Sequence, residues 1–201
     1  MRSDRRRIVA GIVAPLALGM VLIGASGCSS DHAAPVATVS GVAAADVTFA
    51  QMMIPHHEQA VVMADMALDP KADASPFVTE LAEEIRGAQA PEISQMQAWL
   101  ADWGAPSAMP TDHDAHGGHS MDGMTMDGMM TDEQMAELAA AKGKAFDQMW
   151  LTMMIEHHEG AIVMAEQVRA QSANSDVTAL ASAIIVAQRK EIAQMKKELA
   201  A

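Results

Sequence analysis

The chain has 201 residues, of which 50% are hydrophobic, and its formal net charge is −13. A chain this acidic is poorly suited to bind nucleic acid or anionic lipid through its protein surface, and it is better suited to bind cations. It contains one cysteine, which excludes an internal disulfide, and no tyrosine. Its apolar surface therefore depends on aliphatic side chains and on 19 methionines.

The N-terminus resembles a bacterial lipoprotein signal over residues 1–27. The basic start MRSDRRR is followed by an apolar stretch and by small residues directly before Cys28, which is the order of a secretory signal. We expect Cys28 to be lipidated and to anchor an extracytoplasmic protein to the outer face of the membrane; the alternative is an ordinary signal peptide with a spare thiol. Loss of residues 1–27 removes four arginines and one aspartate, which makes the formal charge −16. Residues 28–45 are expected to be a flexible tether.

Residues 46–201 are expected to form one all-α domain, because strand-like alternation is absent and Ala, Met, Gln and Glu dominate. Capping residues mark three helix starts, at Asp46, Ser75 and Thr131. The expected helices cover 47–67, 76–102, a third segment from Thr131 to Arg169 with an interruption near Gly143, and 176–199.

Two stretches of the chain repeat each other. Residues 52–64 read MMIPHHEQAVVMA and residues 153–165 read MMIEHHEGAIVMA. The second and fourth expected helices also share a pattern, in which the run from Ile85 to Met96 recurs from Ile184 to Met195. Two copies of a helical hairpin predict a four-helix bundle with pseudo-twofold symmetry.

Each copy places two adjacent histidines inside an apolar face. A helix turns about 100° per residue, so His56 shares a face with Met52 and Met63, whereas His57 turns aside towards a groove between helices. The same relations recur in the second copy. Pro55 precedes His56 directly, and it either kinks the helix or marks its start.

These faces, together with those of the following helices, offer imidazole, thioether, carboxylate and amide groups, which are groups that ligate metals. The alternative is that the methionines fill the core and that Glu92 and Glu191 keep buried imidazoles hydrogen bonded. The candidate ligands of the two half-sites are His56, His57, Met52, Met63, Met96 and Glu92, and His157, His158, Met153, Met164, Met195 and Glu191. The residues expected to support these ligands are Glu58, Gln89, Glu159 and Gln188.

The segment between the second and third expected helices, residues 104–131, is expected to be a disordered linker rich in Met, His, Gly and Asp. Core filling does not explain methionine in such a segment. Thioether sulfur suits Cu(I), and imidazole suits both Cu(I) and Cu(II). The alternative is an acidic linker with incidental methionine. The candidate ligands in the linker are His113, His116, His119, Met121, Met124, Met126 and Met129.

The pattern M-I-x-H-H-E-x-A-x-x-M-A, followed by I-x-x-A-Q-x-x-E-I-x-x-M, resembles the family called domain of unknown function 305, over residues 46–199. The resemblance implies a secreted or membrane-anchored protein with a ferritin-like helical bundle. It also implies a link to copper, because one cyanobacterial relative is regarded as a periplasmic copper-binding protein. Pro91 departs from the usual family pattern. The family motif falls on His56, His57, Met63, Gln89, Glu92 and Met96, and on His157, His158, Met164, Gln188, Glu191 and Met195.

We therefore expect a non-enzymatic, copper-binding lipoprotein that sequesters copper or hands it over, with Cu(I) preferred and Cu(II) as the other candidate. Its partners are then the metal ion and the membrane, while the sequence leaves open which protein donates or accepts the metal and whether the chain forms an oligomer. One alternative is a structural or interaction module of the cell envelope without metal. Another is a di-iron oxidase, but that site requires Glu-x-x-His motifs, which the chain lacks.

Overall fold

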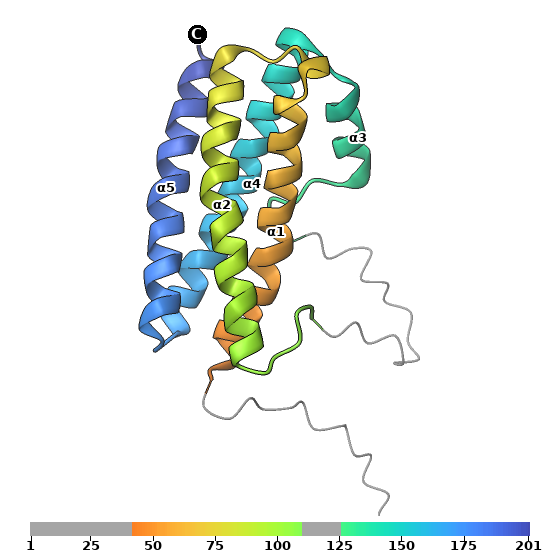
Figure 1. Ribbon diagram of the computed structural model, residues 1–201. Helices are drawn as coiled ribbons and strands as arrows, with labels where there is room; N and C mark the ends of the chain where they lie inside the picture. The colour runs from red at the N-terminus through yellow and green to blue at the C-terminus, as the bar shows by residue number, and fades with distance from the viewer. Residues whose placement is uncertain (1–41, 110–125) are drawn as a thin grey trace, which may run out of the picture. The chain divides into compact units, whose positions relative to one another are not determined.

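The computed structural model describes residues 42–109 and 126–201. These ranges contain five α-helices, one short 3₁₀-helix and no strand, so the prediction of an all-α fold is confirmed (Figure 1). The signal, Cys28 and most of the tether lie outside the described residues, as do residues 110–125 of the linker. The elements are α1 (Ala44–Leu68), η1 (Pro70–Ala72), α2 (Pro76–Asp102), α3 (Asp132–Ala140), α4 (Gly143–Gln171) and α5 (Ser175–Leu199).

Of the three predicted capping residues, Ser75 and Thr131 cap helices and Asp46 does not, and Asn174 caps a third helix. Ser75 accepts from the Val78 amide at the start of α2, and Asn174 accepts from the first amides of α5. Thr131 and Gln134 form the predicted capping box of α3. Asp46 does not cap α1, which begins earlier, after Ala43, and leaves Asp46 buried within its first turn.

The third expected helix is divided into α3 and α4. Ala141 and Lys142 are extended, and Gly143 has a φ of +56° at the start of α4. This φ lies in the left-handed region, which glycine adopts without steric cost. The interruption predicted near Gly143 is therefore confirmed.

The four long helices pack as two antiparallel hairpins, α1 with α2 and α4 with α5, and the hairpins meet along α1 and α4 (Figure 1). In Figure 1, α1 and α5 run upwards, while α2 and α4 run downwards. α2 therefore ends at one end of the bundle and α4 begins at the other. A long crossover between two helices distinguishes ferritin-like bundles from simple up-and-down bundles.

Both internal prolines lie inside continuous helices, Pro55 in α1 and Pro91 in α2. The alternative that Pro55 marks a helix start is therefore wrong. Each proline lacks an amide hydrogen and leaves the carbonyl four residues earlier without its helical donor. No helix within the described ranges is both long enough and apolar enough to cross a membrane.

The core consists of two hydrophobic clusters. The Trp150 cluster gathers the C-terminal half of α1, the N-terminal halves of α2 and α4, and the end of α5. The Phe49 cluster gathers the opposite halves of the same four helices. Between them each helix carries buried polar residues, which we call the polar layer: His56 and His57 on α1, Gln89 on α2, His157 and His158 on α4, and Gln188 and Glu191 on α5.

Candidate metal centre

All four histidines of the polar layer are fully buried, with 0% of each residue exposed. Adjacent helical residues point about 100° apart, so burying both requires neighbours on two sides of the helix. α1 has these neighbours in α2 and α4, and α4 has them in α1 and α5. Both histidines of each pair can be buried because each pair lies where its helix packs against two other helices.

His56 and His157 face each other across the contact between α1 and α4. Their ring centroids are 3.7 Å apart and their planes are inclined by 41°. Burial, followed by the neighbouring His57, lowers the pKa of His56 to about 3. Burial, followed by the neighbouring His56 and His158, lowers the pKa of His157 well below its usual value. Both imidazoles are therefore neutral at pH 7, which is the form that binds metals.

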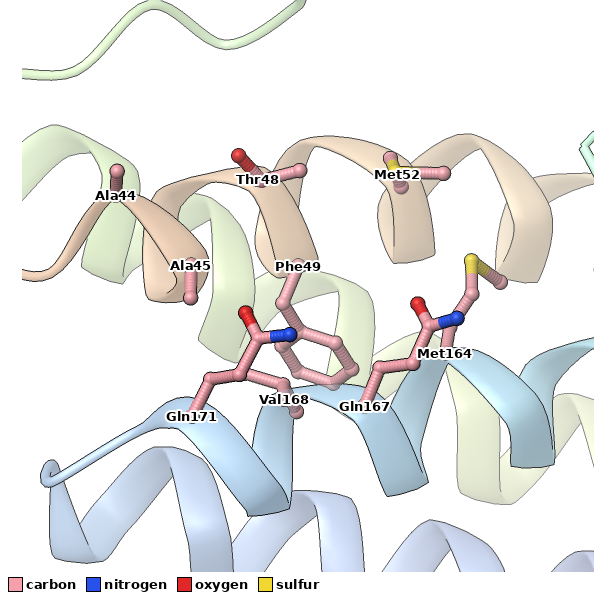
Figure 2. Close-up of a pocket in the computed structure, with 9 residues that line it drawn as sticks. All are labelled: Ala44, Ala45, Thr48, Phe49, Met52, Met164, Gln167, Val168 and Gln171. Atoms are coloured by element: carbon pink, nitrogen blue, oxygen red, sulfur yellow. The ribbon is translucent and has the colours of Figure 1, made fainter.

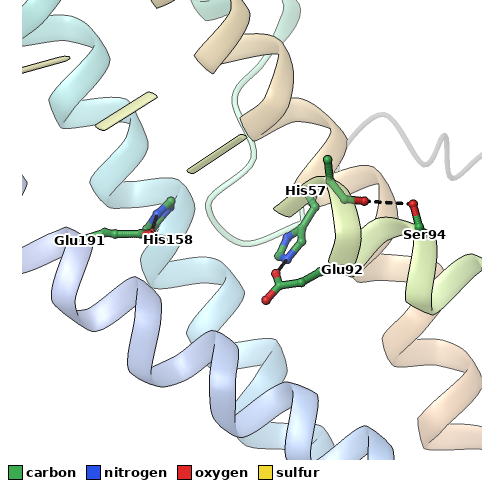
Figure 3. Close-up of polar contacts among 6 residues, drawn as sticks. His57, Glu92, Ser94, His158 and Glu191 are labelled. Atoms are coloured by element: carbon green, nitrogen blue, oxygen red, sulfur yellow. Dashed lines mark hydrogen bonds and ion pairs between the residues drawn. The ribbon is translucent and has the colours of Figure 1, made fainter. Parts of the chain in front are cut away.

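The other histidine of each pair turns to the second helix of its own hairpin. Nε2 of His57 lies 2.8 Å from Oε2 of Glu92, and Nε2 of His158 lies 2.6 Å from Oε2 of Glu191 (Figure 3). An ionised carboxylate can only accept a hydrogen bond, so each Nε2–H donates to it. When these rings are neutral, the arrangement leaves Nδ1 of each with a free lone pair, as is common where a carboxylate orients a metal-binding histidine.

The polar layer contains most of the buried side-chain atoms that lack a hydrogen-bond partner. Eight of the ten such atoms in the described part of the chain belong to it. Buried polar groups in proteins are nearly always paired, and a cluster of unpaired ones indicates a site for water or an ion. The eight atoms are Nδ1 of His56, His57 and His158, both ring nitrogens of His157, both amide atoms of Gln89, and Oε1 of Gln188.

The structure separates those methionines of each predicted half-site that lie on the histidine-bearing helices, α1 and α4. Met63 and Met153 lie in the Trp150 cluster, whereas Met164 lies in the Phe49 cluster and Met52 packs against it. Each cluster therefore receives one methionine from each half of the repeat. The two half-sites and their assigned ligands stay a prediction, and the two methionines on each histidine-bearing helix lie in different clusters. Met195 and Met96 are likewise divided between the two clusters.

Met52 shares a helical face with His56, but it does not lie in the centre of the core. It is half-buried and lines a surface pocket of about 260 Å³ between the start of α1 and the end of α4, together with Met164 (Figure 2). The next residue, Met53, is fully buried in its place. The reason is that the buried arc of α1 is centred between α2 and α4, and Met52 lies at its edge.

The remaining predicted residues are placed as follows. Glu58 and Glu159 are exposed, and Glu159 pairs with Lys196 at 2.8 Å rather than with a histidine. Three histidines and two methionines of the linker lie outside the described residues: His113, His116, His119, Met121 and Met124. Among residues 42–109 and 126–201, no three side chains of His, Cys, Asp or Glu are grouped to hold a metal ion. A metal centre here would therefore need histidine with ligands of another kind, such as thioethers.

Comparison with known proteins places the chain in a family. The sequence model of the domain of unknown function DUF305 matches residues 46–199. The chain belongs to the DUF305 family. A DUF305 fragment from Deinococcus radiodurans is 31% identical, with a TM-score of 0.68 over 79% of this chain and 97% of the fragment.

Two further proteins are similar to this chain over most of its length. A predicted secreted protein from Streptomyces coelicolor is 33% identical, with a TM-score of 0.67 over 78% of this chain and 92% of its own. CopM in its Cu(II)-bound form is 34% identical, with a TM-score of 0.61 over 77% of this chain and 95% of its own. CopM has also been solved with Cu(I) and with Ag. A search of curated protein sequences found no significant match.

Sequence reasoning missed the residues that hold both described ends of the linker on this DUF305 domain. The amide of Gln51 donates to the carbonyls of Pro106 and Ala108, at 2.8 and 3.3 Å. The amide of Gln59 bonds to the backbone of Met130. Residues 104–109 and 126–131, which the sequence assigned to a disordered linker, are thus in part bonded to α1. A signal was available, because the repeat pairs Gln59 with Gly160 and the two copies differ there.

The bond between His158 and Glu191 yields a first testable prediction for this DUF305 protein. Glu191→Gln is expected to lower the free energy of unfolding of the metal-free domain by about 1.5 kcal/mol, because a buried charge-assisted hydrogen bond becomes a neutral one. Urea unfolding at pH 7 measures this loss. Glu166→Gln is the control, since Glu166 pairs with Arg189 on the exposed surface, where an ion pair contributes little. Equal effects of the two variants would contradict the prediction.

Proposed function

We propose that this DUF305 protein binds copper, preferentially Cu(I), in the polar layer of its bundle, and that it sequesters or hands over the ion without catalysing a reaction. The central pair of His56 and His157 carries the proposal. These imidazoles come from the two halves of the repeat, they are buried and neutral, and three of their four ring nitrogens lack a partner. The other two histidines each retain a free Nδ1 in the same layer.

The preference for Cu(I) follows from charge. Imidazole and thioether are neutral ligands that suit Cu(I), and a monovalent ion brings less charge into a buried layer than a divalent one. The clusters on either side of the layer supply buried methionines, among them Met63, Met153 and Met164. The relative CopM has been solved with Cu(I), Cu(II) and Ag, which supports a site for this group of ions.

Glu92 and Glu191 have a supporting role in this proposal rather than the ligand role that the sequence suggested. Their carboxylates are bonded to Nε2 of His57 and His158. There they orient the two rings, raise the basicity of Nδ1 and place negative charge near the ion. Gln89 and Gln188 remain candidate partners for the unpaired nitrogens, because both are buried in the same layer.

The proposed location is the outer face of the membrane, with lipidated Cys28 as the anchor and residues 28–45 as the tether. The Met/His-rich linker would capture copper by ligand exchange and the bundle would hold it more rigidly. Support comes from the order of residues in the N-terminal signal, from thioether chemistry, which needs no thiol outside the cytoplasm, and from the Streptomyces relative, a predicted secreted protein.

A structural module of the cell envelope is the second candidate. The pairing of His57 with Glu92 and of His158 with Glu191 favours it, because the imidazoles of these two histidines have hydrogen-bond partners without any metal. This candidate predicts that histidine substitutions change stability while the metal content stays at zero.

The test is the copper stoichiometry of the mature protein under reducing conditions, compared among three forms. Wild type is expected to bind ions in both the linker and the bundle. Deletion of residues 112–125 should remove only the linker-bound ions, and His56→Gln with His157→Gln should remove only the bundle-bound ion. Thr152→Gln, at an exposed position of α4, is the control. Near-zero copper in every form would refute copper binding and favour the structural module.

A further inference from the structure

The segment Met126–Met130, which we call the strap, is docked on the bundle beside the central histidine pair. The amide of Gln59 on α1 donates to the Met130 carbonyl at 2.8 Å and accepts from the Met130 amide at 2.8 Å. One side chain thus satisfies both backbone groups of one strap residue. Two bonds closed into a ring fix the direction of the strap as well as its position.

The strap touches α4 backbone to backbone at Gly160. A Cβ atom built on Gly160 would lie 1.8 Å from the carbonyl oxygen of Asp127 and 3.0 Å from Cα of Gly128. A Cβ built on Gly128 would lie 2.5 Å from the Glu156 carbonyl oxygen and 3.1 Å from Cα of His157. Because neither Gly128 nor Gly160 has a Cβ atom, the backbones of the strap and α4 approach each other more closely here than any other pair of residues would permit.

The turn within the strap directs the carbonyl group of Asp127 towards His56. The Met129 amide donates to the Met126 carbonyl at 2.9 Å, which closes a turn, and Gly128 has a φ of +83°. A positive φ at the third position is typical of a type II turn. The carbonyl of the second residue, Asp127, is not used by that turn, and it lies 3.3 Å from Nε2 of His56.

The contact with Asp127 distinguishes His56 from its repeat partner. A carbonyl only accepts, so Nε2 of His56 carries the hydrogen and Nδ1 keeps its lone pair. Neither ring nitrogen of His157 has a partner at hydrogen-bonding geometry, although the backbone of His56 lies close enough to oppose the lowering of the His157 pKa. Gln59 and Gly160 occupy equivalent positions of the repeat, and they serve the strap differently: the first binds it and the second makes space for it.

We propose that the strap is a positioning element of the metal centre, docked by Gln59 and Gly160 so that the Asp127 carbonyl holds His56 with Nδ1 as its free nitrogen. The inference rests on the proposed function for the part that concerns metal affinity. Its other part, the hydrogen position on His56, is a property of the metal-free protein. The two duplicated halves then contribute unequal histidines, one fixed and one free to adapt.

The test uses two variants of the mature protein, Gly160→Ala and Gln59→Leu. The first introduces a Cβ that the strap cannot accommodate, and the second removes both bonds to Met130. The matched controls are Gly87→Ala, whose Cβ would meet no atom within 4 Å, and Gln97→Leu at an exposed position of α2. Nitrogen-15 NMR of the metal-free imidazoles reports the hydrogen position on His56, and competition with a chromophoric chelator reports Cu(I) affinity.

Both strap variants are expected to give His56 a mixed tautomer signature and to weaken Cu(I) binding about tenfold, the lower end of the effect of losing a partner behind a metal-binding histidine. The controls should match wild type. Unchanged His56 signals and unchanged affinity in both strap variants would overturn the inference while leaving copper binding intact. If wild type bound no copper, the proposed function would fail, and the nitrogen signals would still decide whether the strap fixes His56.

Discussion

The metal-free domain is expected to lose about 2 kcal/mol of its free energy of unfolding between about pH 7.5 and pH 5 through His56, and His157 adds a further loss of the same sign. In the unfolded chain His56 and His157 take up protons near their usual pKa of about 6.5. In the folded domain the pKa of His56 is lowered to about 3 and that of His157 is lowered well below 6.5. The unfolded state therefore binds more protons throughout this interval, so stability is complete above about pH 6.5 and is lost as the pH falls towards 3.

Urea unfolding at a series of pH values measures this effect, with chelator present to exclude metal. Protonation of exposed carboxylates contributes below about pH 5, so the upper interval isolates the histidines. The control is the double variant His56→Gln with His157→Gln. Its unfolding should take up about two fewer protons than that of wild type, so its stability should depend less steeply on pH. A wild-type slope equal to that of the double variant would show that the central imidazoles are not held neutral by the fold.

The sequence was sufficient to predict the helices, because their starts are encoded locally. Ser75, Thr131 and Asn174 each accept hydrogen bonds from amides within the next three residues, and such contacts do not depend on the rest of the fold. The prediction that Asp46 caps α1 is wrong. Its carboxylate could have capped α1, but residues 44 and 45 continue the helix past it, and the side chain is buried instead.

The metal-ligand sets stay predictions, because whether two residues on one helical face lie close together depends also on their distance along the helix axis. Met52 and Met63 share a face with His56, yet they are separated by about 16 Å along the helix axis at 1.5 Å per residue. That separation places them in different hydrophobic clusters. The antiparallel packing of α1 against α4 then brings Met63 to the same cluster as Met153. A helical face alone does not say which residues of two helices meet.

The strap was beyond sequence reasoning for a different reason. Its contacts join residues about 70 positions apart, such as Gln59 with Met130 and His56 with Asp127. Local composition indicated only a segment rich in Gly, Asp and Met. The divergence between Gln59 and Gly160 within an otherwise close repeat was the available hint, and its meaning required the packing of α1 on α4.

The packing of α1 on α4 also changes what the duplication predicts for copper. If each half bound its own ion, His56 and His157 would belong to different sites. Their ring centroids are instead 3.7 Å apart, so both imidazoles are close enough to contact one ion. One ion shared between the halves is therefore expected in the central pair, and it would link the two hairpins across their only extensive contact among the described helices.

A shared ion makes each single substitution as damaging as the double one. Cu(I) at about one hundred times its dissociation constant is expected to raise the stability of wild type by about 2.7 kcal/mol. His56→Gln and His157→Gln should each abolish this increase, because either variant removes a ligand of the same ion. Thermal unfolding with and without Cu(I), on protein lacking residues 112–125, measures the shift without linker-bound ions. Independent half-sites would leave about half of the bound copper in each single variant and none in the double variant, and that pattern would exclude a shared centre.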